Sequence, residues 1–311
     1  MSVAGRTASR EDAAAAVEAS GRAGSRAGIY TALGLLYVIW GSTYLAIAMA
    51  IEGFPPFLMG GIRFVIAGAL LYPLLRLHGA PAPTAAEWRG AGIVGTFLLV
   101  GGNGGVAYAE QWVASGVAAV VIATTPIWTG LFAGLFGRWP SRVEWAGLAL
   151  GLAGVVLLNT GADLRAHPAG AVALLLAAVC WAFGSAWSRH LSMPSGLMAV
   201  AAQLLVGGAA LVLLGLAVGE RLTAWPSARA LWAFVYLIVA GSLVGYSAYI
   251  YLLGRVRPAL ATSYAYVNPV VAVVLGALVA GERITGTTIV SMVVILAGVA
   301  LVLLGRARSA A

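Results

Sequence analysis

The 311-residue chain has few charged residues, no lysine and a single cysteine. Charged side chains make up only 9% of it, whereas a typical soluble domain has about 25%. Hydrophobic residues make up 61%, so the chain could not cover its surface with polar groups, and its surroundings must be lipid. All 18 basic side chains are arginine, which excludes chemistry through a lysine Schiff base. Cys180 has no second cysteine to pair with, so we expect it to serve packing.

The sequence also lacks the clusters that nucleic-acid binding or metal catalysis would need. The net charge is +8, but the arginines lie between apolar runs and form no continuous basic face. The three histidines, His78, His167 and His190, lie in loops or at the ends of apolar runs, and none forms an i, i+4 pair. No deep carboxylate pair occurs. We therefore expect no enzyme, no metal, no cofactor and no nucleic-acid partner.

Residues 1–28 differ from the rest of the chain in composition. They are rich in Ala, Arg, Ser and Gly, and they contain no apolar core of the signal-peptide type. We expect a disordered, basic cytoplasmic tail here. The alternative is a short amphipathic helix on the membrane surface.

Long apolar runs with short polar connections fill the remainder of the chain. A bilayer core of about 30 Å needs roughly 20 apolar residues in a helix, and the runs do not alternate in polarity as barrel strands do. The sequence predicts an all-α integral membrane protein with ten transmembrane helices. We place them at 29–51, 57–77, 90–109, 114–136, 143–160, 169–189, 196–218, 230–253, 258–280 and 285–305.

The distribution of arginines tests this number of spans. With the N-terminus in the cytoplasm, thirteen arginines lie in cytoplasmic segments, four lie on the opposite side and Arg63 lies within a span. Cytoplasmic loops carry an excess of arginine and lysine, and a missed helix would scramble the bias after it. The pattern favours ten spans in a bacterial-type inner membrane, with both termini cytoplasmic.

The second half of the chain repeats a pattern found in the first half. Proline, tyrosine and Gly-Ser matches occur in the same order in both halves, and the offset between them changes slightly, as loop insertions would produce. A shift of 143 places Gly41-Ser42 on Gly184-Ser185, Tyr108 on Tyr251 and Pro126 on Pro269; a shift of 140 places Arg63 on Gln203 and Gly68 on Gly208; and a shift of 144 places Gly154 on Gly298. We divide the chain into a first five-helix repeat, 29–161, and a second, 169–305.

An odd number of spans in each repeat has a topological consequence. The second repeat must enter the membrane from the opposite side, so the two are inverted repeats. This architecture is typical of secondary transporters, whose substrate site lies near the midplane between the repeats. The alternative is a duplicated membrane scaffold or sensor that transports nothing.

Arg63 lies six residues inside its span, roughly 9 Å along the helix. A charge at the bilayer centre costs about 2.5–3.5 kcal/mol on insertion scales and is usually functional or paired. Arg63 would bind a carboxylate or another anionic group in a central cavity. The alternative is an arginine that reaches the interface or pairs structurally. Gln203, its counterpart, would offer a neutral hydrogen bond.

Pro126 and Pro269 lie in the middle of matching spans, each directly after a polar residue, Thr125 or Asn268. A proline removes one helical hydrogen bond, and the freed carbonyl needs a partner such as a side chain or cavity water. We predict hinges that line the pathway. The alternative is a static kink.

Several spans contain more polar and aromatic residues than lipid would tolerate. We predict that they form a cavity with aromatic walls and a few hydroxyls, with interhelical hydrogen bonding as the alternative for some. The residues are Trp40, Ser42, Thr43, Tyr44, Asn103, Tyr108, Trp181, Ser185, Tyr251, Tyr264, Tyr266 and Asn268. Glu110, at the end of the third span, would couple to protons if burial raised the pKa of its carboxyl; otherwise it is interfacial.

These residues resemble the EamA-type branch of the drug/metabolite transporter superfamily. The resemblance rests on Trp40-Gly41-Ser42-Thr43-Tyr44, Gly61-Ile62-Arg63-Phe64, Ser115 to Ala119, Trp181 to Ser185 and Pro258 to Val271, with Gly281-Glu282 after the ninth span. Gly137-Arg138 stands at the matching corner of the first half, so the copies have diverged there. The resemblance implies a ten-helix inner-membrane carrier, most often an exporter of metabolites or drugs.

We therefore expect a secondary, non-ATP exporter of small amphiphilic metabolites such as amino-acid-like compounds. Multidrug efflux is the alternative within transport. Glycines at four-residue spacing, Gly130 with Gly134 and Gly147 with Gly151, allow close helix contact. We expect them to serve packing within the monomer, and a homodimer stays open.

Overall fold

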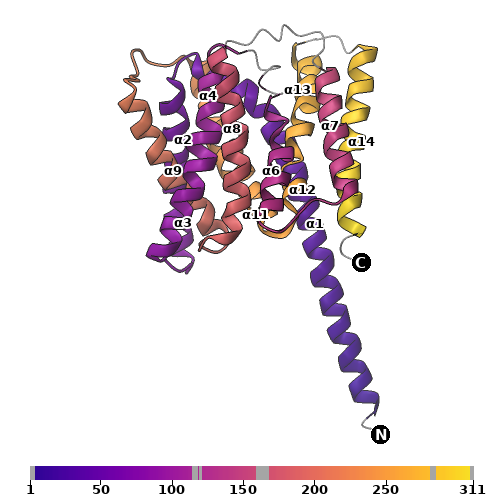
Figure 1. Ribbon diagram of the computed structural model, residues 1–311. Coiled ribbons are helices and arrows are strands. Elements are labelled where there is room, and N and C mark those ends of the chain that lie inside the picture. Colours follow the sequence, from indigo (N-terminus) through magenta and orange to yellow (C-terminus); the bar gives the residue numbers. More distant parts are fainter. Residues whose placement is uncertain (1–3, 114–117, 119–120, 159–167, 281–284, 309–311) are drawn as a thin grey trace.

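The computed structural model describes residues 4–113, 118, 121–158, 168–280 and 285–308. Within these residues every regular element is a helix, as the lengths of the apolar runs predict. The helices lie side by side in one bundle and run roughly along a common direction (Figure 1). The described part of the chain is thus all-α.

Seven helical stretches in the described part of the chain are long and apolar enough to cross a membrane. Each overlaps an expected span. They are Arg26–Ile51 in α1 (Ala4–Ile51); α2 (Pro56–Leu77); Ala85–Ala109, made of α3 (Ala85–Gly95), η1 (Thr96–Gly104) and α4 (Gly105–Ala109); Pro168–His190, made of α8 (Pro168–Trp187) and η2 (Ser188–His190); α9 (Leu197–Ala217); Ala228–Arg255, made of α10 (Ala228–Tyr236), η3 (Leu237–Gly245) and α11 (Tyr246–Arg255); and Gly286–Gly305 in α14 (Gly286–Arg308).

The other three expected spans correspond to shorter described helices. They are α6 (Thr125–Leu135), α7 (Arg142–Leu158), and α12 (Pro258–Ala261) followed by α13 (Tyr264–Ala280). Part of the expected span 114–136 lies outside the described residues. The described part of the chain thus has seven candidate spans, and ten remains a prediction.

The N-terminal segment differs from the tail that we expected. Helix α1 begins at Ala4 and continues without a break into the first span, and its first part projects beyond the bundle (Figure 1). Alanine, arginine and glutamate are strong helix formers. Extending an existing helix also needs no new nucleus, so the membrane-spanning part can propagate into residues 4–28.

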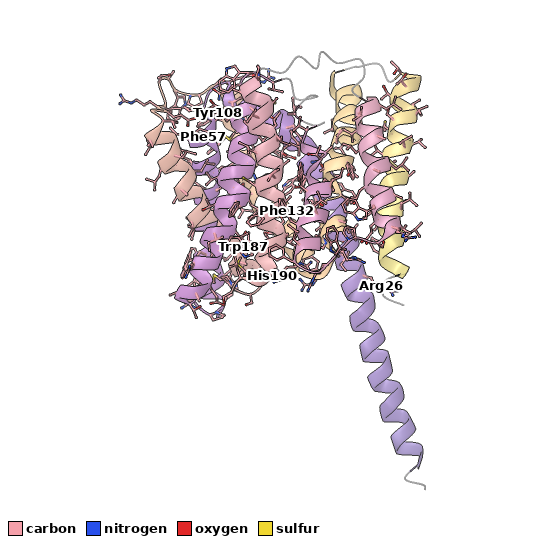
Figure 2. The ribbon with its side chains drawn as sticks, in the orientation of Figure 1. Arg26, Phe57, Tyr108, Phe132, Trp187 and His190 are labelled. Atoms are coloured by element: carbon pink, nitrogen blue, oxygen red, sulfur yellow. The ribbon has the colours of Figure 1, made fainter. Side chains whose placement is uncertain are left out.

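The two halves run in opposite directions. Figure 2 places Arg26, Trp187 and His190 at one end of the bundle, which we name the terminal end, and Phe57 and Tyr108 at the other, the distal end. Helix α1 therefore runs from the terminal end towards the distal end, whereas α8 runs back to the terminal end. The last turn of α14 also lies at the terminal end (Figure 1).

The helix contacts show that the two halves are related by symmetry. Helix α2 packs on α9 and α7 on α14, which joins each helix to its own counterpart. The other contacts come in matched sets: α1 packs on α13 as α6 packs on α8, and α1 packs on η3 as α8 packs on η1. A pseudo-two-fold axis between the halves produces this pattern.

Close contacts between α2 and α9 confirm the shift that places Arg63 on Gln203. A Cβ atom on Gly61 would lie 2.9 Å from the carbonyl oxygen of Gly208, and a Cβ on Gly68 would lie 3.2 Å from that of Ala201. Adding 140 to 61 gives 201, and subtracting 140 from 208 gives 68. The axis therefore converts one contact into the other.

Tryptophan contacts correct the shift that we expected in the first span. A Cβ on Gly245 would lie 2.5 Å from Nε1 of Trp40, and one on Gly102 would lie 2.5 Å from Cε3 of Trp181. Trp40 therefore corresponds to Trp181, a shift of 141, while Gly102 corresponds to Gly245, a shift of 143. Matching Gly41-Ser42 with Gly184-Ser185 was wrong by two positions, because small residues recur by chance in so apolar a chain.

Both halves also contain a nine-residue π-helix, η1 in one and η3 in the other. Each lies in the middle of a stretch long enough to span the membrane. π-Helical geometry is rare and occurs mostly as single turns, often at functional sites. The paired π-helices mark the corresponding segments as the place to look for a site.

Candidate functional site

A cavity lies where the two halves meet. It encloses about 680 Å³, counting the space at its opening. Its wall residues come from both repeats: Trp40, Thr43, Tyr44, Ile47, Arg63, Phe64, Gly102, Asn103, Val106, Ile122, Thr125, Ala177, Ala178, Trp181, Gly241, Ser242, Tyr246, Tyr264 and Asn268. We name it the central cavity. Eight of the residues that we predicted from the sequence line it: Trp40, Thr43, Tyr44, Arg63, Asn103, Trp181, Tyr264 and Asn268.

Arg63 supplies the positive charge in this wall. Only 4% of the residue is exposed, and its Nη2 donates a hydrogen bond of 2.9 Å to Oδ1 of Asn103. Its Nε is buried and has no hydrogen-bond partner. Helix α2 begins with Pro56 and places Arg63 on its buried face. A buried guanidinium with an unused donor is suited to receive a carboxylate.

Asn268 supplies an unused acceptor to the same cavity. The residue is 2% exposed, and its side chain interacts with that of Tyr44 through a hydrogen bond. Its Oδ1 nevertheless has no partner. Thr125, its counterpart in the first half, is also buried and lines the cavity. The wall thus offers an unused donor and an unused acceptor, which would suit a ligand that carries both kinds of group.

An aromatic cluster borders the cavity. The rings of Trp40 and Trp181 meet edge to face with centroids 5.4 Å apart, and Tyr264 lies 4.7 Å from Trp40. Tyr249 contacts both tryptophans at 5.3 Å and accepts a hydrogen bond from Nε1 of Trp181. These four residues are the aromatic cluster. They provide large apolar surfaces from both halves, as ligand pockets commonly do.

Glu110 follows the third span, which ends at Ala109. Both of its carboxylate oxygens are buried and have no hydrogen-bond partner. Burial raises the pKa of this carboxyl to about 8, and the positive charge of Arg63 limits the rise. The side chain is therefore no solvated interfacial carboxylate, and its protonation state bears on Arg63.

Six predicted residues lie away from the central cavity. Ser42 bonds to the carbonyl of Ile39 and to the hydroxyl of Tyr236, and Tyr108 stacks on Phe57. Tyr266 donates to the carbonyl of Leu148. The other three are placed as follows: Ser185 bonds to Tyr249 in the core, and Gln203 and Tyr251 line a different pocket.

The two prolines occupy different positions within their helices. Pro126 lies in the first turn of α6, directly after a turn at 123–124, so it starts a helix. Pro269 lies inside α13, and the break in that span occurs earlier, at 262–263. The predicted role of both prolines as hinges stays a prediction.

Sequence reasoning missed Tyr246, Tyr249 and Ser242. The first and third line the central cavity, and Tyr249 completes the aromatic cluster. A tyrosine or serine in an apolar run often serves packing, so composition alone does not single these out. Tyr246 could have been found, because the shift that places Pro126 on Pro269 also places Asn103 on Tyr246.

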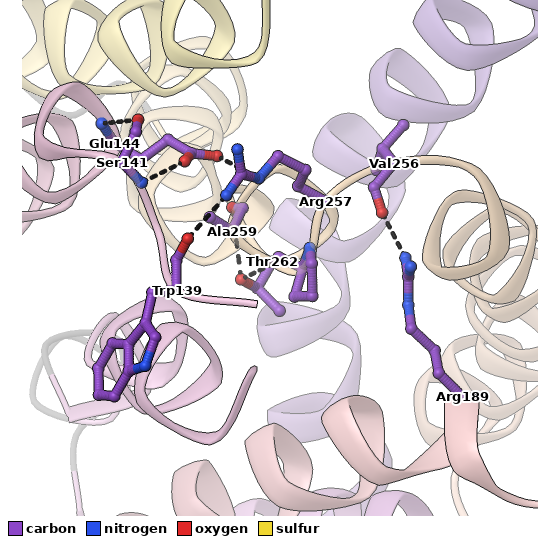
Figure 3. A network of polar contacts seen from close by, with 9 residues as sticks. Trp139, Ser141, Glu144, Arg189, Val256, Arg257, Ala259 and Thr262 are labelled. Carbon is purple, nitrogen blue, oxygen red and sulfur yellow. Dashed lines mark hydrogen bonds and ion pairs between the residues drawn. The ribbon is translucent and has the colours of Figure 1, made fainter. Parts of the chain in front are cut away.

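A polar network fixes the loops at the terminal end (Figure 3). Nε of Arg257 lies 3.1 Å from Oε1 of the buried Glu144, and its Nη2 donates to the carbonyl of Trp139. Glu144 also accepts from the backbone nitrogen of Ser141, the residue directly before α7. Arg189 donates to the carbonyls of Leu253 and Val256. These bonds tie α7 to the residue that precedes α12, and η2 to the end of α11.

The comparisons with known proteins agree with this architecture. The model of the EamA-like transporter family matches twice, at residues 27–160 and 168–304. The chain belongs to the EamA-like transporter family. It is a membrane transporter and no enzyme, which confirms the resemblance found in the sequence. In the described residues, no group of three His, Cys, Asp or Glu could hold a metal ion.

Several relatives carry transporter names. The protein is 45% identical over 279 residues to the uncharacterized inner membrane transporter YedA of Escherichia coli K12, covering 89% of this chain and 91% of that one. It is 26% identical to a probable amino-acid metabolite efflux pump of Salmonella typhimurium, covering 85% and 91%. One solved crystal structure superposes with a TM-score of 0.74 at 22% identity, covering 91% and 98%, which supports the fold alone.

Proposed function

We propose that this protein is a secondary transporter of the inner membrane that exports small amphiphilic metabolites, amino-acid-like compounds among them. In this proposal the chain has ten spans with both termini in the cytoplasm, and the inverted repeats rock about the central cavity to expose it to each side in turn. The opposite directions of α1 and α8 in Figure 2 support it, as does the bias in the arginines.

The observation that carries the proposal is the pair of unused polar groups in the cavity wall. Nε of Arg63 and Oδ1 of Asn268 are both buried without partners, and both residues line the same space as Trp40 and Trp181. A carboxylate on Arg63, a donor on Asn268 and an apolar group against the tryptophans would satisfy all three surfaces. An amino-acid-like compound has these parts, and the efflux-pump relatives support the same substrate class.

The test is the metabolite content of the medium around overexpressing cells, measured by untargeted mass spectrometry. Controls are empty-vector cells and cells that express Arg63→Ala in equal amount. A compound enriched only with the intact protein would identify the substrate. If no compound is enriched, and purified protein in liposomes moves no member of a broad metabolite panel, the proposal is wrong and the scaffold interpretation is favoured.

Multidrug efflux is the second candidate, and the aromatic cluster favours it. Trp40, Trp181 and Tyr264 offer broad faces that accept planar amphiphiles without a specific polar contact. Efflux predicts raised drug tolerance in expressing cells and its loss in Trp181→Ala. Unchanged tolerance in cells that express the intact protein would exclude this candidate.

A further inference from the structure

A second pocket opens at the terminal end of the bundle. It encloses about 930 Å³, counting its opening. It lies between η2, the start of α9 and the end of α11, and Figure 2 places His190 of η2 at that end. Its wall residues are Ser188, Arg189, Met193, Pro194, Gly196, Leu197, Ala199, Val200, Gln203, Ser247, Ile250, Tyr251, Leu253, Gly254 and Arg255.

One hydrogen bond joins the walls of the two spaces. Tyr246 lines the central cavity and Gln203 lines the second pocket. The hydroxyl of Tyr246 donates to Oε1 of Gln203 at 2.6 Å, and each residue is 1% exposed. The pair therefore lies between the two spaces: Tyr246 faces the central cavity, and Gln203 faces the second pocket.

This pair is the counterpart of Arg63 and Asn103. The shift established where α2 crosses α9 takes Arg63 to Gln203, and the shift established by the glycines against the tryptophans takes Asn103 to Tyr246. The first pair, at 2.9 Å, faces the open central cavity. In a transporter built from inverted repeats, equivalent positions of the two repeats face opposite sides of the membrane. When one of them lines the open pathway on its side, the other lies at the closed pathway on the opposite side.

We propose that the second pocket is the vestibule through which substrate enters from the terminal end, and that the Tyr246–Gln203 hydrogen bond is the latch that closes it. The inference rests on the proposed transport function and adds the route and its closing contact. When the latch opens, the second pocket and the central cavity become continuous, and Gln203 turns from Tyr246 to water or substrate.

The charge of the vestibule suits an anionic group. Arg255 is exposed, with its guanidinium carbon 3.9 Å from the ring centre of Tyr251. Nε of Arg189 is buried without a partner. No carboxylate is among the described residues that line the pocket. A substrate with a carboxylate would meet two arginines on entry and Arg63 in the cavity.

The test of the latch is the accessibility of a cysteine in the central cavity from each side of the membrane. In a Cys180→Ala background, Ser242→Cys reports the cavity and Ser188→Cys marks the terminal side. A membrane-impermeant thiol reagent is applied to inside-out and right-side-out vesicles. Tyr246→Phe leaves Oε1 of Gln203 unsatisfied only in the closed state. We expect labelling of Ser242→Cys from the terminal side to rise about fivefold, the shift that loss of one hydrogen bond produces.

Matched variants separate the latch from general loosening. Gln203→Leu removes the acceptor and should raise labelling as Tyr246→Phe does. Tyr266→Phe also removes a buried hydroxyl, which bonds to Leu148 at 2.9 Å away from both pockets, and should change nothing. Unchanged labelling in Tyr246→Phe, or an equal rise in Tyr266→Phe, would overturn the latch. Labelling needs no transported compound, so a failed export assay leaves this result standing, and a failed latch leaves export standing.

Thiol reagents of opposite charge test the vestibule. At Ser247→Cys, which lines the second pocket, we expect an anionic methanethiosulfonate to react several times faster than a cationic one. Arg255→Gln should reduce that ratio. If the cationic reagent reacts as fast as the anionic one, the vestibule does not favour anionic groups, and that part of the proposal is wrong.

Discussion

The second and third spans of each half are bridged by one polar pair, and the two pairs differ in charge. Arg63 with Asn103 carries a full positive charge into the central cavity, whereas Gln203 with Tyr246 is neutral and lies between two pockets. The backbone contacts around them are nearly the same under the pseudo-two-fold axis. Duplication has therefore kept the scaffold symmetrical while the chemistry diverged. Because only the first half has the arginine, an anionic substrate would bind in the central cavity at Arg63 and would bind less tightly at the neutral Gln203–Tyr246 pair.

Making the first pair neutral should have the largest effect. Arg63→Gln keeps a polar side chain but removes the charge that would hold a carboxylate, and a hydrogen bond to a charged group contributes about 1.5–3 kcal/mol. We expect export of the compound found in the medium to fall about a hundredfold, the equivalent of about 2.8 kcal/mol. The measurement is efflux from preloaded cells at matched expression. Arg63→Lys should keep part of the export activity. Full activity in Arg63→Gln would show that the charge of Arg63 does not bind the substrate.

The crossing of α2 with α9 tests how strictly the scaffold is shared. A Cβ on Gly61 would lie 2.6 Å from the backbone nitrogen of Val212, which cannot move aside as a side chain could. We expect Gly61→Ala to lower the free energy of unfolding by about 2 kcal/mol. Gly34→Ala is the control, because nothing lies within 4 Å of its added Cβ. The readout is thermal unfolding in detergent, and equal midpoints for the two variants would contradict the close contact.

The starts of α7 and α14 offer a sharper comparison of the halves. Glu144 and Ser141 in one half correspond, by the shift of 144, to Thr288 and Thr285 in the other, where the backbone nitrogen of Thr288 donates to Oγ1 of Thr285. Glu144 is buried and also pairs with Arg257, which is partly exposed. We expect Glu144→Ala to cost about 2 kcal/mol of unfolding free energy. Thr288→Ala should lower the free energy of unfolding far less. Equal shifts in the thermal midpoints of the two variants would show that the Glu144–Arg257 ion pair adds no stability.

Glu110 gives the smallest expected effect, a dependence on pH. Leu253 occupies the matching position, so only the first half has this ionisable group. Because burial raises the pKa of the Glu110 carboxyl to about 8, the group is neutral at pH 7, and Arg63 is left free for a substrate carboxylate. The carboxylate that forms at higher pH competes for Arg63. Export should therefore fall to about half between pH 7 and pH 8, following the titration. A Glu110→Gln variant with the same pH profile would refute this.

The sequence was sufficient for the features that depend on composition and order. Long apolar runs predicted the helices, and a lone arginine within a run predicted a wall residue of the cavity. The shift read from Arg63 and Gln203 is the one that backbone contacts confirm.

Other features depend on which face of a helix points inward, and the sequence leaves this open. Ser42, Thr43 and Tyr44 are consecutive residues of α1; Thr43 and Tyr44 line the cavity, whereas the hydroxyl of Ser42 meets that of Tyr236. Tyr266 was predicted to bind substrate, but its hydroxyl reaches the carbonyl of Leu148 across a helix contact. The polar end of a long side chain bonds to whichever partner the helix packing brings near, and a single sequence does not reveal the packing.

The paired π-helices have a consequence for the history of the chain. Each of η1 and η3 is nine residues long and lies within the corresponding stretch of its half. π-Helical turns are rare, so two independent insertions at corresponding places would be an unusual coincidence. A single ancestral five-helix unit that already had the extra residue explains both. The unusual geometry would then be older than the duplication, whereas the charge of Arg63 distinguishes the copies that followed it.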